Sequence, residues 1–71
     1  MNDLNSKVSN IVGRYINANN ISQDAISKKI GVSQSSLSRA LTGGRAWLVR
    51  DVEALAAIGV DFSHLFDNEA V

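Results

Sequence analysis

The sequence contains no cysteine, no proline and only one histidine, His64. Without cysteine the chain has neither disulfides nor thiol chemistry, as is usual for proteins of a reducing cytoplasm. One histidine with scattered acids supplies neither the ligand set of a metal site nor a nucleophile with its base. These absences predict a protein that is not an enzyme and that holds no metal and no cofactor.

Long apolar runs are also missing, and the N-terminus lacks the charged-then-apolar order of a signal peptide. We therefore expect a cytoplasmic protein that does not enter a membrane. The absence of proline and a high share of aliphatic residues favour an all-α fold. A chain of 71 residues forms one domain, 1–71, and buries roughly 60% of its unfolded surface.

The net charge is zero, but it is unevenly distributed along the chain. Residues 1–50 hold seven basic and two acidic residues, a net charge of +5, whereas residues 51–71 hold five acidic residues and no Lys or Arg, a net charge of −5. Such asymmetry predicts a basic face suited to a polyanion, with an acidic pole elsewhere. A dipolar surface that only keeps the protein soluble is the alternative.

The chain is organised around residues 22–43, which contain two capping signals and one glycine turn. Ser22 and Ser33 can each accept a hydrogen bond from the first turn of a following helix. The apolar residue before each cap, Ile21 or Val32, can pack on the fourth helical residue. Gly31 stands where the first helix must stop, so we expect a left-handed conformation there. The stretch predicts a helix-turn-helix.

Three further helices complete the prediction. The first runs from residue 2 or 3 to about 17, because apolar residues recur there at helical spacing. The fourth covers about 48–58, and a short fifth helix covers about 62–66. Trp47 precedes the fourth helix, where its ring either closes the core or lies against a sugar or phosphate.

The helix at 34–42 sorts into two faces at 100° per residue. Leu37, Ala40 and Leu41 form the buried face. The opposite face is polar and short-chained, so it could approach a groove closely; its residues are Gln34, Ser35, Ser38, Arg39 and Thr42. An ordinary solvated face with a capping serine is the alternative.

The motif resembles the helix-turn-helix of the lambda-repressor/Cro superfamily, the XRE type of small regulators. The residues that carry the resemblance are Gln23, Ser27, Ile30, Gly31, Gln34, Leu37 and Gly43, followed more loosely by Trp47, Val52, Leu55, Ile58, Gly59, Val60 and Leu65. Two positions depart from the pattern. Alanine is more usual than serine at Ser27, and the fourth helix is one residue short between Leu55 and Gly59.

The resemblance implies a compact five-helix domain, prokaryotic or phage-encoded, that binds duplex DNA as a phage repressor or Cro-like regulator of transcription. The helix at 34–42 would lie in the major groove. Its candidate base contacts are Gln34, Ser35, Ser38 and Arg39, with Gln34 foremost because glutamine pairs bidentately with adenine. The candidate phosphate contacts, which fix the register, are Gln23, Ser33, Thr42 and Arg45.

A single helix reads few base pairs, so we expect two copies on a pseudo-palindromic operator, as a weak homodimer strengthened by DNA. Phe62, Leu65 and Phe66 offer apolar area for this contact, unless they close the core. The tail at 67–71 is expected to fray. The alternative function is a protein-interaction module of the same fold, an antitoxin or adaptor, that uses the apolar C-terminal helix.

Overall fold

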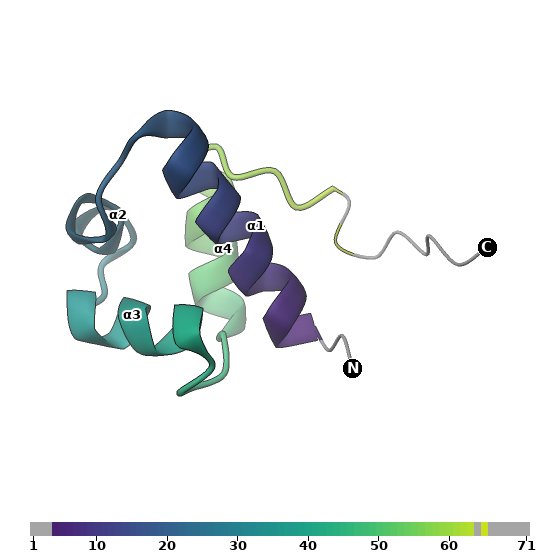
Figure 1. The fold of residues 1–71 in the computed structure, drawn as a ribbon. Helices are drawn as coiled ribbons and strands as arrows, with labels where there is room; N and C mark the ends of the chain where they lie inside the picture. Colours follow the sequence, from purple (N-terminus) through teal and green to yellow (C-terminus); the bar gives the residue numbers. More distant parts are fainter. Residues whose placement is uncertain (1–3, 64, 66–71) are drawn as a thin grey trace.

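The computed structural model describes residues 4–63 and 65, and this part of the chain is all-α, as predicted (Figure 1). The predictions made for His64, for Phe66 and for the tail at 67–71 lie outside the described residues. Four helices and no strand are present in the described part. The helices are α1 (Leu4–Asn19), α2 (Gln23–Ile30), α3 (Gln34–Thr42) and α4 (Val49–Ala57).

Helix α1 ends at Asn19, two residues later than predicted. The Asn19 side-chain amide donates to Tyr15 O at 2.9 Å, which satisfies a carbonyl of the last turn. Asn20 follows with a φ of 54°, a left-handed conformation that asparagine tolerates better than most residues. Gly13, inside α1, has open space where a Cβ would stand, so it does not mark a close helix contact.

The two helix caps and the turn between α2 and α3 have the predicted geometry. Ser22 Oγ accepts from Ala25 N–H at 3.0 Å, and Ser33 Oγ accepts from Ser36 N–H at 3.0 Å. Gly31 ends α2 with a φ of 77°, which confirms the left-handed position. The chain therefore leaves α2 and enters α3 within three residues, as Figure 1 shows.

One core joins the four helices. Helix α2 packs against α3 and α4, and α1 packs against α3. All four helices send apolar side chains into the same cluster. Its buried members are Val8, Val12, Ile26, Leu37, Ala40, Trp47, Leu55, Val60 and Leu65. Ser27 is buried with them, and its hydroxyl donates to Asp24 O at 2.7 Å, so serine fits here without an unsatisfied group.

The segment after α4 turns back towards α1. Gly59 has a φ of 112°, and Val60 N–H donates to Leu55 O at 3.1 Å. The Tyr15 hydroxyl donates to Ile58 O at 3.3 Å and so attaches this turn to α1. The fourth helix was predicted to be one residue short between Leu55 and Gly59 relative to the family pattern. In the structure α4 ends at Ala57, one residue before the predicted end at about 58.

The predicted fifth helix is not confirmed. Residues 61–63 are not helical, and Leu65 N–H donates to Phe62 O at 2.9 Å to close a single turn. Leu65 still docks on the core, at 7% exposure. None of the helices in the described ranges has both the length and the apolar character needed to cross a membrane.

Candidate nucleic-acid interface

The outer face of α3 brings together the four residues that were predicted to contact bases. Gln34, Ser35 and Arg39 are exposed and Ser38 is half-buried. The opposite face is closed, because Leu37 is 0% and Ala40 1% exposed. Burial of this inner face fixes the rotation of the helix, so a polar surface without acidic residues is held outward.

Ser33 can serve the helix and an anion together. Its oxygen accepts from Ser36 N–H, which leaves its own proton free to be donated. It stands at the N-terminus of α3, where free N–H groups and the helix dipole favour a negative charge. Gln23 occupies the equivalent first position of α2 and is half-exposed.

Thr42 is less ready to bind a phosphate. Its hydroxyl donates back to Ser38 O at 3.1 Å and to Arg39 O at 3.3 Å. A phosphate oxygen only accepts, so the hydroxyl would have to leave these carbonyls before it could donate to one. Thr42 is exposed at the end of α3, where such a rotation has room.

Arg45 differs from the other predicted phosphate contacts because it is bonded inside the protein. Its Nε donates to Ser36 O at 3.0 Å, and its Nη1 donates to Ala46 O at 2.9 Å and to Asp51 Oδ2 at 3.0 Å. Asp51 is only 2% exposed. Nothing in the sequence pattern indicates that this carboxylate is buried.

Trp47 belongs to the core and does not face the solvent, which decides between its two predicted roles. Its indole N–H donates to Ser9 Oγ at 2.9 Å, and the Ser9 hydroxyl donates to Ala40 O at 3.0 Å. The Trp47 backbone N–H donates to Asn5 Oδ1 at 2.8 Å. These bonds hold the loop after α3, and the end of α3 itself, on α1. Sequence reasoning missed Ser9 and Asn5, because nothing local marks them.

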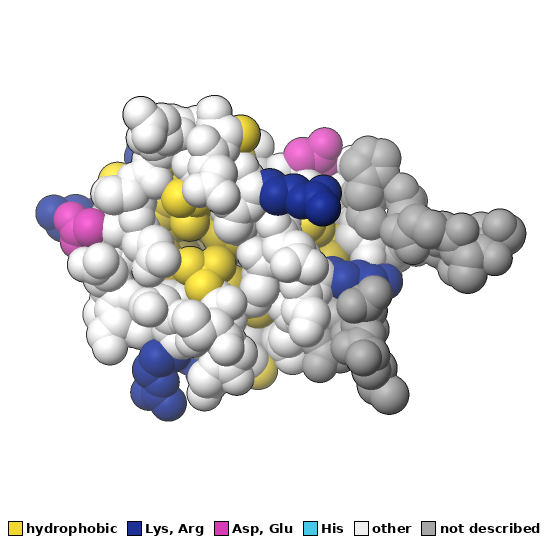
Figure 2. Space-filling model, in the orientation of Figure 1, with side chains coloured by type: hydrophobic (Ala, Val, Ile, Leu, Met, Phe, Trp, Pro, Cys, Tyr) yellow, Lys and Arg dark blue, Asp and Glu magenta, His cyan; other side chains and the backbone are white. Residues whose placement is uncertain are grey.

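On the face drawn in Figure 2 the Lys and Arg side chains lie apart from one another and form no continuous patch. The described residues hold seven basic and four acidic residues, a net charge of +3. Lys28 pairs with Asp24 at 3.2 Å on the surface of α2, as expected of a solvated face, and Arg45 pairs with Asp51. The described part thus has a positive net charge, and the basic residues that Figure 2 shows are dispersed over the surface.

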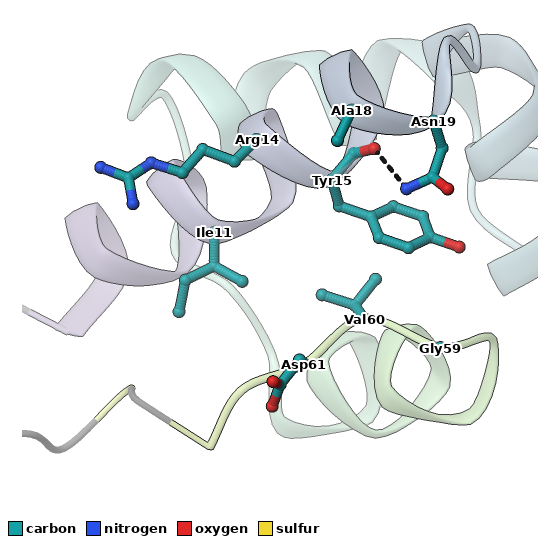
Figure 3. A pocket seen from close by; sticks show the side chains of 8 residues that line it. All are labelled: Ile11, Arg14, Tyr15, Ala18, Asn19, Gly59, Val60 and Asp61. Carbon is teal, nitrogen blue, oxygen red and sulfur yellow. Dashed lines mark hydrogen bonds between the residues drawn. The ribbon is translucent and has the colours of Figure 1, made fainter.

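A groove of about 350 Å³ lies between α1 and the segment after α4, and no residue of α3 lines it (Figure 3). Ile11, Tyr15 and Val60 line it, with Arg14 and Asp61 at its edges. It contains no nucleophile with a neighbouring base. Among the described residues, no group of three His, Cys, Asp or Glu could hold a metal ion.

The predicted partner surface is mostly occupied by the protein itself. Leu65 belongs to the core, and Phe62 is partly buried against it. The large hydrophobic residues that stand exposed in the described part of the chain are instead Leu4, Leu48 and Val49. They surround a second groove of about 260 Å³, beside Trp47.

Comparison with protein families gives a match to the helix-turn-helix family over residues 13–65. The match includes α2, the turn, α3 and α4, and it ends where the described structure ends. Neither the curated proteins nor the solved structures gave a match.

Proposed function

We propose a function from one premise: the chain belongs to the Cro/C1-type helix-turn-helix (XRE) family of DNA-binding regulators of transcription. Within this family we assign sequence reading to α3, which lies in the major groove with residues 34–42. The observation that carries the assignment is the outward face of α3, which is polar, free of acidic residues and fixed by a fully buried inner face.

Gln34 is the leading base contact. It stands exposed at the first position of α3, so its amide extends beyond the helix end and can pair bidentately with adenine N6 and N7. Arg39, one turn further along, reaches a guanine or a phosphate. Ser35 and Ser38 are short enough to let the helix approach while they add hydrogen bonds.

Gln23, Ser33 and Thr42 contact phosphates and set the register of α3 on the duplex. Ser33 is best placed, since its proton is free and the dipole of α3 points at the same site. Such contacts supply affinity and carry no sequence information. Arg45, the fourth predicted phosphate contact, differs from these three because its guanidinium donates to oxygens of the protein itself.

The regulator is proposed to be phage repressor-like or Cro-like and to bind a pseudo-palindromic operator as two copies. Two reading helices about 34 Å apart are the usual way for this motif to gain specificity. Because Leu65 is held in the core, Phe62 and Phe66 are the predicted contact residues that remain for the contact between copies. This small area suits a dimer that is weak in solution and stabilised by DNA.

A protein-interaction module is the second candidate. Leu4, Leu48 and Val49 are exposed around one groove, and a cluster of exposed apolar residues is typical of a surface that meets another protein.

A binding measurement with random duplex DNA at low salt distinguishes the two functions. A DNA-reading protein binds it weakly but measurably, because phosphate contacts are independent of sequence; a pure interaction module does not bind it.

Selection of bound sites from random duplex DNA tests the proposed function. We expect one enriched motif with two half-sites related by a dyad, each with a base step that depends on Gln34. Failure to enrich any motif, together with no binding to random duplex at low salt, would overturn the DNA-reading function and leave the interaction module.

A further inference from the structure

Arg45 is attached to both ends of α3. It follows the glycines that end this helix, and its backbone N–H donates to Arg39 O at 3.3 Å. Its Nε–H donates to Ser36 O at 3.0 Å, in the first turn of α3. The side chain therefore runs back along the helix that precedes it and reaches the turn that carries Gln34.

The same guanidinium is bonded to the start of α4. Asp51 Oδ2 accepts from Arg45 Nη1 at 3.0 Å and from Leu48 N–H at 3.1 Å. Leu48 has no side-chain acceptor to cap α4, so Asp51 provides the cap. A carboxylate that is 2% exposed needs a cationic partner, and Arg45, with 20% of its side chain exposed, is that partner.

These contacts leave Arg45 poorly suited to a phosphate. The guanidinium has five N–H donors in a rigid fork, and three of them are directed at protein oxygens. Its charge already faces Asp51, so it has little remaining charge with which to displace the counterions of a DNA backbone.

We propose that Arg45 is a positioning residue, which with Asp51 fixes the first turn of α3, and hence Gln34, against α4. The inference rests on the proposed function, since the position of this turn matters only where α3 reads bases. A bidentate pair with adenine needs two hydrogen bonds of ordinary length together, so a shift of about 1 Å in the first turn breaks the pair. Loss of the Arg45–Asp51 pair therefore alters sequence preference more than affinity for DNA in general.

The test measures the full-length chain against its selected site and against random duplex DNA over a range of salt concentrations. The variants are Asp51→Asn, whose buried side chain cannot touch DNA, and Arg45→Lys, which keeps the charge but loses the fork. For each folded variant we expect roughly tenfold weaker binding to the selected site and a flattened preference at the base step read by Gln34. Binding to random DNA and its salt dependence stay unchanged.

Arg50→Lys is the matched control, because Arg50 is an exposed arginine of α4 that lines the same surface hollow as Arg45 and Asp51. It should leave the base preference intact. Circular dichroism establishes which variants are folded; if Asp51→Asn is not, Arg45→Lys decides alone, since it retains a cation opposite Asp51.

The proposal is overturned if Arg45→Lys retains full affinity and preference. It is also overturned if Arg45→Ala weakens selected and random DNA equally and lowers the slope of log K against log salt by about 1, which is the behaviour of a phosphate ligand. Failure of the proposed function looks different, since the wild-type chain itself would then bind no DNA.

Discussion

Serine side chains connect the helices of this small domain in several distinct ways. Ser22 and Ser33 accept from helix N-termini, Ser27 satisfies itself inside the core, and Ser9 joins Trp47 to Ala40. These hydroxyl groups thus have different structural roles, which single substitutions can separate.

Gln34→Ala tests reading at a single residue. The variant should bind the selected site ~1–3 kcal/mol more weakly and lose its preference at one base step of each half-site, since the bidentate pair is gone. Gln23→Ala is the control, because it removes a glutamine from the same first position of α2. Competition assays with single-base variants of the site should show that Gln23→Ala weakens all sequences alike. Unchanged preference in Gln34→Ala would place the reading residues elsewhere.

Ser9→Ala tests the hydroxyl between Trp47 and Ala40. The substitution leaves the indole N–H without its acceptor and Ala40 O without the Ser9 donor, in a partly buried place. We expect the free energy of unfolding to fall by about 1–3 kcal/mol in urea denaturation. Asn10→Ala, at the exposed neighbouring residue, should change it by less than about 0.5 kcal/mol. Equal effects of the two would show that the hydroxyl contributes nothing specific.

At the scale of the helices, the local signals of the sequence were sufficient for most of the fold. A cap such as Ser33 acts within three residues and a helix stop such as Gly31 within one, so spacing alone places them. The burial of Asp51 could not be predicted, because it depends on how the irregular segment 43–48 brings Arg45 to it. The Ser9–Trp47 bond joins residues 38 positions apart, and no local pattern encodes that pairing.

Gly13 in α1 and Gly31 in the turn after α2 offer a matched test of backbone conformation. Open space surrounds the Cβ position at Gly13 and at Gly31, so neither substitution to alanine meets an atom within 4 Å. Gly31→Ala should destabilise the protein by about 1–2 kcal/mol, because its φ of 77° strains an L-residue. Gly13→Ala should stabilise it by about 1 kcal/mol, as alanine suits a helix interior better.

Thermal and urea unfolding of the two variants measures both effects. The changes in unfolding free energy should have opposite signs. Steric crowding cannot cause this difference, because no atom lies within 4 Å of the added Cβ at either position. If Gly31→Ala were as stable as the wild type, residue 31 would not be left-handed in solution, and the turn that orients α3 would differ from the one described.

At the scale of the whole molecule, the described part of the chain carries the outer face of α3, proposed to read DNA, and a groove bordered by Leu4, Leu48 and Val49 around one small core. Leu65 shows how little area is left over: the residue predicted for a partner is needed to close the core. Because Leu65 is not available for a partner, we expect association in free solution to be weak and to be strengthened by DNA.

The predicted assembly is a monomer, or a loose dimer, in free solution and two copies on the selected site. Sedimentation velocity should give a 2:1 ratio of protein to full operator, and a DNA with one half-site removed should bind one copy, at least tenfold more weakly.

Leu65→Ala should reduce the free energy of unfolding by about 2–5 kcal/mol, as expected of a core leucine. A Leu65→Ala variant that remained fully stable but bound only as a monomer would return this residue to the interface.

The buried indole also makes the molecule its own optical probe. Trp47 is the single tryptophan of the chain, and it lies in the loop that joins α3 to α4 with its N–H group bonded to Ser9. Emission of the folded protein should therefore be blue-shifted and shielded from iodide, and all of the signal should come from this loop. Because Trp47 is only 9% exposed, we expect a change in its emission when DNA is added to report a movement of the loop.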